Sequence, residues 1–262
     1  MHDQQQRIKE KLRLASSSVY EIISREGAAE LARSLPALAW SGLAAGFCIC
    51  FSMLAEAYFK MHLPDHPAKP LVENIGYTFG FIIVIMGRLQ LFTENTITVM
   101  LPLFDNPAWR NLKRTLNLWV VVFSANLIGT FIVAMLLTKF SFASVEQLAA
   151  VFEVSHHAVH RPLGEVFIQG IPAGFLIAAL VWMLPSAENN EFFVIFMMTY
   201  LIAIGDFTHV VAGSAEAFVL MLGGDISIAS AWGYIGAAGA GNVIGGTGLF
   251  ALLAYAQVRD EI

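Results

Sequence analysis

Two otherwise apolar stretches of the chain carry the ionisable and hydroxyl side chains that could do chemistry. Residues 87–96 read GRLQLFTENT, and residues 205–216 read GDFTHVVAGSAE. One Arg or Asp at the centre of a membrane helix costs about 2.5–3.5 kcal/mol, so such groups persist only where they are paired or face water. Arg88 and Asp206 have opposite charges, and we expect them to form a mutual salt bridge, as a structural pair or within a pore. Glu94 and Glu216 follow Arg88 and Asp206 in the sequence. We expect their carboxylates to cap backbone N–H groups that are freed where a helix is interrupted.

His209 is the titratable side chain that stands out in these stretches. Imidazole can donate, accept or carry a proton near neutral pH. The matching position in the first stretch is Leu91, and Thr93 supplies a hydroxyl nearby. Phe92, Leu91 and Phe207 could form dry constrictions on either side of a polar centre. They could equally be core residues, and His209 could be a packing histidine, so both interpretations stay open.

The remaining histidines and the one serine near His209 suggest two other chemistries. The pairs His62/His66 and His156/His160 are each four residues apart, as on a metal-binding helix. Nothing nearby in the sequence completes either set, so we expect solvated loop histidines, no metal site and no cofactor. Ser214 is near His209 and Asp206, but the base of a serine nucleophile normally comes from another helix. We therefore expect a protein that is not an enzyme.

Composition identifies the elements that must position these residues. The 262-residue chain is 57% hydrophobic and 13% charged, with a mean hydropathy of +0.66, whereas soluble domains are roughly 45–50% apolar and about 25% charged. This excludes a soluble enzyme domain, and a net charge of −5 without a basic face excludes nucleic acid as a partner. Six membrane spans are predicted, at roughly 36–60, 72–104, 112–139, 165–185, 192–222 and 229–257.

An internal repeat relates the two halves of the chain. Three short matches occur in the same order: 45–47 with 173–175, 87–88 with 205–206, and 126–129 with 242–245. They indicate a duplicated three-span unit, and because three is odd the copies must be inverted. Glycine and ionisable residues inside the second and fifth spans predict that these two helices are broken. In such folds the permeant site lies at the midplane between the repeats.

The distribution of basic residues orients the chain in the membrane. Lys and Arg are concentrated in the first 35 residues and in the 104–115 loop, which predicts that both termini are cytoplasmic. The N-terminal helix is amphipathic, and it either lies on the membrane or packs on the bundle. We divide the chain into the N-terminal helix (1–35), the first three-helix repeat (36–139), an extracytoplasmic connecting loop (140–163) and the second repeat with a short tail (164–262).

Several motifs resemble the formate/nitrite transporter family. They are the sequences of residues 91–93 and 207–209, together with the glycine-rich residues 241–246. The strings 76–86 and 90–96 resemble the YfdC branch of that family. The resemblance implies an aquaporin-like six-helix protomer, a homopentamer in the inner membrane with one pore per subunit, and passage of formate, nitrite or hydrosulfide. It also implies that His209 and Thr93 lie between two hydrophobic constrictions, with Leu91 and Phe92 beside Thr93.

The chain departs from the family pattern at four positions. Gln90 and Thr208 replace the glutamates usual at the two breaks, and Gly174 and Gly213 replace asparagines. The leading hypothesis is a pore for small monovalent anions, which pass alone or with a proton, because a neutral conjugate acid is far easier to desolvate than an anion. The alternative is an aquaporin-like channel for a small neutral solute, which the missing polar groups favour.

Overall fold

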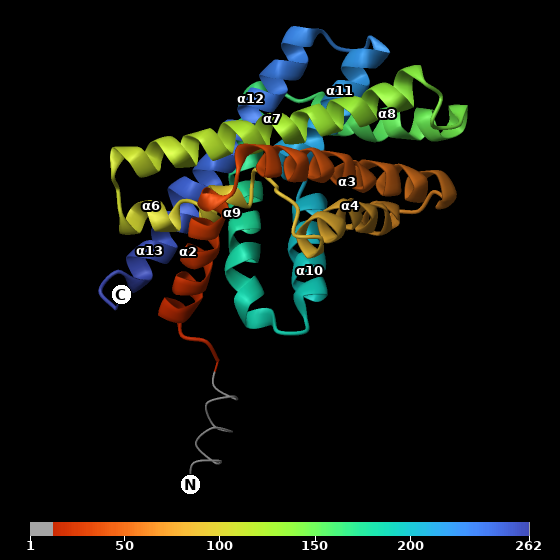
Figure 1. The fold of residues 1–262 in the computed structure, drawn as a ribbon. Coiled ribbons are helices and arrows are strands. Elements are labelled where there is room, and N and C mark those ends of the chain that lie inside the picture. Colours follow the sequence, from red (N-terminus) through yellow and green to blue (C-terminus); the bar gives the residue numbers. More distant parts are fainter. Residues whose placement is uncertain (1–12, 262) are drawn as a thin grey trace.

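The described part of the protein is built from helices. The computed structural model describes residues 13–261, so residues 1–12 of the predicted N-terminal helix lie outside it. Figure 1 shows the arrangement. The helices are α2 (Ser16–Ala32), α3 (Leu35–His62), α4 (Lys69–Met86), α5 (Asn95–Thr98), α6 (Leu101–Asp105), α7 (Trp109–Lys139), α8 (Val145–Val159), α9 (Leu163–Ala187), α10 (Glu191–Ile204), α11 (Val210–Gly223), α12 (Ile228–Val243), the π-helical η1 (Ile244–Ala251) and α13 (Leu252–Val258).

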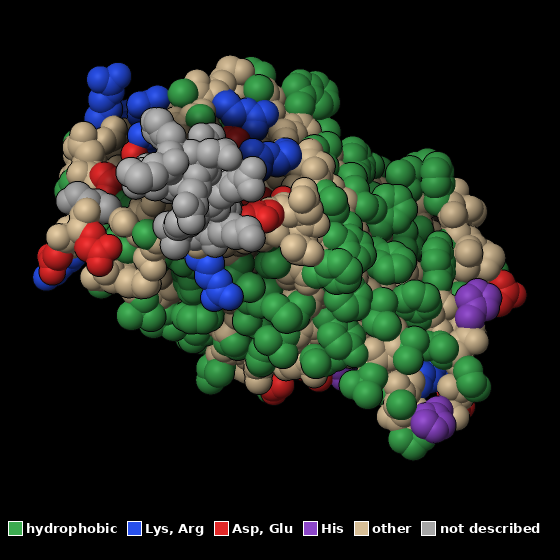
Figure 2. Space-filling model, turned by 90° about the horizontal axis from the view of Figure 1, so that it is seen from below, with side chains coloured by type: hydrophobic (Ala, Val, Ile, Leu, Met, Phe, Trp, Pro, Cys, Tyr) green, Lys and Arg blue, Asp and Glu red, His purple; other side chains and the backbone are tan. Residues whose placement is uncertain are grey.

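The outer surface is apolar over a wide area. Five helices are long and apolar enough to cross a membrane, namely α3, α4, α7, α9 and the continuous run α12–η1–α13, and α10 and α11 are shorter apolar helices. Trp40 and Trp109 are 72% and 76% exposed. In Figure 2 apolar side chains cover the region between a charged end and an end with histidines. The predicted all-helical membrane fold is confirmed.

Helices pack within each half of the chain and also between the halves, where α4 lies against α10 and α7 against α11. In the first half α3 packs against α4 and α7, and in the second half α9 packs against α10, α12 and η1. Glycines make the closest approaches. A Cβ at Gly46 would lie 2.3 Å from the Asn126 carbonyl oxygen, and one at Gly174 would lie 2.1 Å from that of Asn242. These four residues belong to the sequence repeat, so the repeat marks two equivalent helix crossings.

The backbone leaves the helical conformation twice within apolar sequence. We call residues 87–94, between α4 and α5, the first connection and residues 205–209, between α10 and α11, the second connection. The second residue of each connection is in the left-handed region, Arg88 at φ 53° and Asp206 at φ 54°. The next N–H then bonds back five residues, from Leu89 to Val84 and from Phe207 to Ile202, both at 3.0 Å. The two helices therefore end in the same way.

α2 packs on the bundle, against α5, α6, α9 and α13. Gly27 allows the closest approach, since a Cβ there would lie 1.8 Å from the Thr98 carbonyl oxygen. The Tyr20 hydroxyl donates to Asp105 Oδ1 at 2.7 Å. Burial and this carboxylate raise the pKa of Tyr20 well above its usual range. Tyr20 therefore stays a neutral donor, and of the two placements left open for this helix, packing on the bundle is the one observed for residues 16–32.

One helix was not anticipated in the segment between the two halves. α8 lies within residues 140–163 and begins with a capping box, in which Ser144 and Gln147 satisfy each other's backbone N–H groups. The capping-box sequence was available as a signal. α8 packs against α3 and α11, which brings it to the second connection.

Candidate functional site

Asn126 fastens the first connection to the helices around it. Its side-chain Nδ2 donates to the carbonyl oxygens of Gly42 (2.8 Å) and Gln90 (2.9 Å). Its Oδ1 accepts the Phe92 N–H at 2.9 Å. One buried amide therefore satisfies two backbone groups of a non-helical segment that has few other partners.

Asn242 fastens the second connection with the same set of bonds. Its Nδ2 donates to the carbonyl oxygens of Gly170 and Thr208, both at 2.8 Å. Its Oδ1 accepts the Val210 N–H, also at 2.8 Å. The sequence repeat identified both asparagines but not this function, since the pattern does not say which backbone groups they reach.

Thr93 and His209 meet at the centre of the molecule. The Thr93 hydroxyl and His209 Nε2 are 2.7 Å apart, and the two side chains are 0% and 2% exposed. His209 Nδ1 accepts the Ala212 N–H at 3.2 Å and so caps α11. Because an accepting nitrogen has no proton, the neutral imidazole carries its proton on Nε2 and donates it to Thr93. The ring of Phe81 packs edge-on against the imidazole, with 4.9 Å between centroids.

The apolar residues next to this pair occupy different surroundings. Leu91 is fully buried. Phe92 packs against the rings of Phe123 and Trp119, with centroids 4.6 and 5.7 Å apart. Phe207 is half-buried and borders a cavity. The two connections therefore present a packed apolar side at Leu91 and Phe92 and a more open side at Phe207.

A cavity of about 460 Å³ reaches His209 and Thr208 from the α8 side of the molecule. Its wall comes from both halves of the chain and from α8. Carboxylates outnumber the Lys and Arg side chains in this wall. Besides Thr208 and His209, the ionisable and hydroxylated lining residues are Glu56, Lys60, Glu73, Tyr77, His157, Arg161, Asp206, Glu216 and Tyr234.

Arg88 and Asp206 do not pair with each other, so the predicted mutual salt bridge is wrong. Arg88 Nη2 lies 3.3 Å from Glu26 of α2, with side chains 81% and 47% exposed. Asp206 Oδ1 lies 3.1 Å from both His157 and Arg161. The two residues occupy equivalent positions at opposite ends of the structure. Glu26 of α2 pairs with Arg88, and residues at the end of α8 pair with Asp206. The repeat pattern does not predict where α2 and α8 pack.

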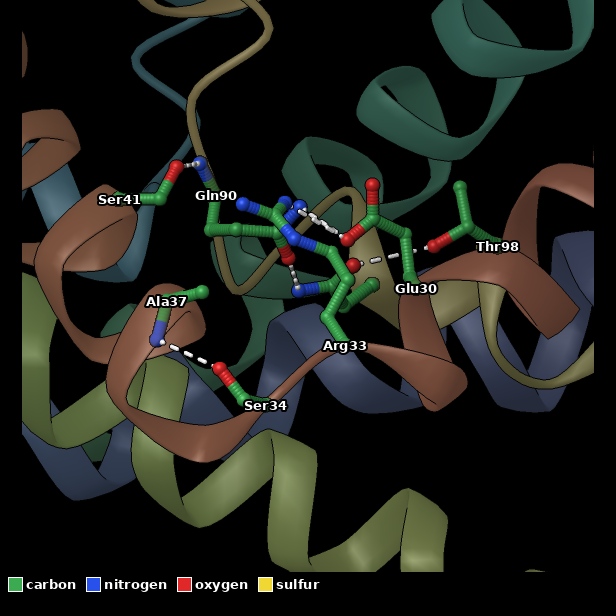
Figure 3. Close-up of polar contacts among 8 residues, drawn as sticks. Glu30, Arg33, Ser34, Ala37, Ser41, Gln90 and Thr98 are labelled. Atoms are coloured by element: carbon green, nitrogen blue, oxygen red, sulfur yellow. Dashed lines mark hydrogen bonds and ion pairs between the residues drawn. The ribbon is translucent and has the colours of Figure 1, made fainter.

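Gln90 links the first connection to α2. Its Nε2 donates to Glu30 Oε2 at 2.8 Å, and its Oε1 accepts from Asn95 Nδ2 at 3.2 Å. Arg33 also binds Glu30, at 2.9 Å. Figure 3 shows Gln90 reaching from the connection toward Glu30, with Arg33 beside it. Thr208, its equivalent in the second connection, lines the cavity instead.

The structure explains both glycines that replace family asparagines. Gly174 lies against the Asn242 backbone, so that helix crossing has no room for a side chain. At Gly213 a Cβ would lie 2.3 Å from the Tyr234 hydroxyl oxygen. Tyr234 therefore occupies the space that a longer side chain at position 213 would need.

The two glutamates expected as helix caps do not act as caps. Within the described residues no side chain caps α5, and Glu94 Oε1 is buried without a hydrogen-bond partner. His209 caps α11, and Glu216 lies farther along that helix, where it lines the cavity. The expectation is wrong because backbone spacing does not specify the direction of a long side chain.

The histidines on α8 bind one another and nearby carboxylates. His156 and His160 are joined through their Nδ1 atoms at 3.0 Å, and His156 is 3.3 Å from Asp225. Across residues 13–261 no group of three or more His, Cys, Asp and Glu could hold a metal ion.

Four lining residues of the cavity were missed by sequence reasoning. Glu56 lies inside the first predicted span, and Glu73 and Tyr77 lie in the second. A glutamate within a span is itself a signal of a paired or wet position. Tyr234 had no such signal, since tyrosine is common near span ends.

Comparison with known proteins places this geometry among transport proteins. A family profile described as "Formate/nitrite transporter" matches residues 17–256. The Escherichia coli K12 protein "Inner membrane protein YfdC" is 40% identical over 246 residues, covering 94% of this chain and 79% of that protein.

Two solved structures have the same fold. The structure titled "FNT family ion channel" has a TM-score of 0.80 at 16% identity, covering 92% of this chain and 99% of its own. The structure titled "Pentameric formate channel with formate bound" has a TM-score of 0.69 at 18% identity, covering 87% of this chain and 98% of its own.

Proposed function

Because the chain belongs to the formate/nitrite transporter family, we propose that it conducts small monovalent anions of the formate, nitrite and hydrosulfide class across the membrane. The observation that carries the proposal is the 2.7 Å contact between Thr93 and His209, where the two halves meet at the end of a cavity. A similar structure is titled a pentameric formate channel with formate bound. We extend pentameric assembly to this chain, with one pore per subunit.

The proposed topology has six membrane crossings in two inverted three-helix repeats of an aquaporin-like bundle. The second and fifth crossings are broken at the two connections, and the paired bonds of Asn126 and Asn242 support this arrangement. Residues 1–35 and the tail lie in the cytoplasm, 36–139 and 164–262 contain the repeats, and 140–163 is extracytoplasmic. The name of the E. coli relative supports location in the inner membrane.

In the proposed pathway an anion enters the cavity from the α8 side and reaches Phe207, Thr208 and His209. His209 Nε2–H can turn from Thr93 to the permeant, and the N-terminus of α11 directs its positive dipole end to the same point. Beyond this point the path is narrowed by apolar side chains and then reaches Gln90. Leu91 and Phe92 form this inner constriction, where a proton bound to the anion lowers the desolvation cost.

The carboxylates in the cavity favour a second candidate, a channel for a small neutral solute. Glu56, Glu73, Asp206 and Glu216 outnumber Lys60 and Arg161 in the wall. Such a wall does not repel a neutral molecule. The two candidates differ in their response to charge, because only the anion pathway produces flux that depends on membrane potential or on accompanying protons.

A panel of solutes in proteoliposomes tests the proposal. We expect formate, nitrite or hydrosulfide to enter vesicles that contain the protein, and uncharged urea and glycerol to enter no faster than they enter empty vesicles. The opposite result would replace the anion channel with the neutral-solute channel.

His209 supplies the matched variants for the same assay. Asn is a good helix N-cap, so His209→Asn should assemble normally while flux falls, because its amide lacks the imidazole's reach to Thr93. Thr93→Ser retains the hydroxyl and should retain flux, whereas Thr93→Val should reduce it. Flux per assembled oligomer that is unchanged in His209→Asn would remove the imidazole from the mechanism.

A further inference from the structure

Glu216 is a buried carboxyl group with no partner in the described chain. It is 6% exposed, and its side chain lines the cavity that ends at His209. Across residues 13–261 neither a hydrogen bond nor an ion pair forms at its carboxylate. Burial of an unpaired carboxylate is costly, so the cavity must supply something that neutralises it.

The groups around Glu216 do not supply the missing charge. Of the two Lys and Arg residues in the wall, Lys60 pairs with Glu153 at 3.0 Å, and Arg161 pairs with Asp206. Glu56 of α3 lines the same cavity and is also unpaired within the described residues. Glu73 Oε1 lies 3.8 Å from Lys69 Nζ, and it is buried without a hydrogen-bond partner. The other titratable groups that face the cavity are Tyr77 of α4, His157 of α8, His209 and Tyr234 of α12.

Two unpaired carboxyl groups that line one cavity repel each other when both are ionised, which raises the cost of ionising both. A bound proton or a bound cation lowers this cost. The described residues contain no group of three or more His, Cys, Asp and Glu suited to a metal ion, which favours the proton. His209 is unsuited to holding an additional proton, because its second nitrogen accepts the Ala212 N–H.

We propose that Glu216, with Glu56, is a proton-binding site that protonates a weak-acid anion in the cavity before it passes His209. This inference rests on the proposed anion function. A protonated carboxyl transfers its proton to the anion, leaving a carboxylate and a neutral acid. The neutral acid crosses and releases the proton on the far side, and the carboxylate takes up a new proton from the water in the cavity. Each cycle moves one anion and one proton together.

The test uses the full-length protein in proteoliposomes with two anions. Formate is the anion of a weak acid, whereas nitrate is the anion of a strong acid and cannot use a proton donor. We expect Glu216→Gln to lower formate uptake and the accompanying proton uptake by about 100-fold, the lower end of what a positioned general acid contributes. Nitrate current should not fall, because Gln has the same shape and removes a negative charge from the path.

Two further variants control the test. Glu165 is exposed at the start of α9 and lies outside the cavity wall, so Glu165→Gln should match the wild type in both assays. Glu56→Gln should reduce formate uptake in the same sense as Glu216→Gln, and it carries the test if Glu216→Gln does not assemble. Infrared difference spectra should also show a carboxylic-acid C=O band at neutral pH that both cavity variants weaken.

Two results would overturn the inference while leaving the anion channel intact. One is formate and proton uptake at the wild-type level in both Glu216→Gln and Glu56→Gln. The other is formate uptake that requires external Na⁺ or K⁺ and brings in no proton, which would make the pair a cation site. Absence of transport of every weak-acid anion by the wild type would instead defeat the proposed function itself.

Discussion

The two connections share a scaffold and differ in chemistry. Asn126 and Asn242 make the same three bonds to equivalent backbone groups in the two halves. At the position where the second connection has His209, the first has Leu91. The two halves therefore share the asparagine that holds the backbone, while the imidazole that donates to Thr93 is present in the second connection alone.

The two connections also differ in what anchors them. The first leads into the four-residue α5 and is tied through Gln90 and Arg88 to α2. The second leads into the 14-residue α11, which His209 caps, and it is tied through Asp206 to the α8 end. An added helix stabilises each connection, and neither helix belongs to the repeat. This difference supports the proposed pathway, in which the second half carries the polar route and the first half the apolar constriction.

Replacement of Asn126 or Asn242, the asparagine clamps that hold the two connections, should cause the largest loss of stability. In Asn126→Ala or Asn242→Ala, at least one N–H and one carbonyl become buried without a partner. Each such group costs about 1–3 kcal/mol, so two of them give an expected destabilisation of about 2–6 kcal/mol in each variant. Thermal unfolding in detergent, with the yield of folded protein, measures the loss in both variants.

Asparagine-to-aspartate variants sharpen this first comparison. Asp keeps the acceptor for the Phe92 or Val210 N–H but cannot donate to the two carbonyls, so it should be no better than Ala. A large loss in one half and a negligible loss in the other would show that the two clamps are not equivalent, despite their matching bonds.

The sequence alone identifies the two asparagines and the Thr93–His209 pair for physical reasons. Asn126 and Asn242 sit in matching strings because each must reach the same backbone groups, and a repeat preserves that requirement. Thr93 and His209 were selected as polar groups in apolar spans, and the fold brings them to 2.7 Å. Apolar periodicity and the cost of burying polar groups both act locally, so they can be detected in a single sequence.

The glycine crossings should give the second largest effect. A Cβ at Gly46 or Gly174 would meet backbone atoms at 2.3 or 2.1 Å, and backbone cannot move aside as a side chain tip can. We expect Gly46→Ala and Gly174→Ala each to destabilise by about 1–3 kcal/mol, the usual cost of overpacking. Thermal unfolding again measures this.

Gly236 of α12 is the matched control for these glycines. No heavy atom lies within 4 Å of a Cβ built there, and Ala is favoured over Gly in a helix interior by about 1 kcal/mol. Gly236→Ala should therefore unfold no earlier than the wild type. If Gly46→Ala is tolerated and Gly174→Ala is not, α3 and α7 can move apart to accept the added methyl group, whereas α9 and α12 cannot.

Partners that come from outside the repeat could not be predicted. Glu26 binds Arg88 only because α2 docks on the first half, and Arg161 binds Asp206 only because α8 ends beside the second connection. Those positions depend on tertiary packing, which neither periodicity nor charge counting describes. The cavity could not be predicted for the same reason, because tertiary packing brings Glu56 and Glu216 to one wall from distant parts of the sequence.

Arg88 and Asp206 should give the smallest effect and the clearest contrast between the halves. Both have positive φ, where an L-residue is strained by roughly 1–2 kcal/mol and Asp by less than Arg. Glycine relieves that strain. Arg88→Gly loses only an exposed ion pair, worth about 0–1 kcal/mol, so its stability should stay level or rise by up to about 1 kcal/mol. Asp206→Gly also loses its bonds to Arg161, whose side chain is only 13% exposed, so it should be neutral or destabilised.

The alanine variants separate strain from charge in this last comparison. Arg88→Ala and Asp206→Ala lose the same ion pairs as the glycine variants but keep a strained backbone, so each should be less stable than its glycine counterpart by about 1 kcal/mol. Unfolding temperatures of the four variants in one detergent measure the difference. A loss of about 3–5 kcal/mol in both single variants, restored by exchanging the two charges, is the signature of a buried mutual pair. That result would contradict the separate partners of Arg88 and Asp206. It would mean that an ion pair links the two halves, whereas in the structure a hydrogen bond between Thr93 and His209 links them.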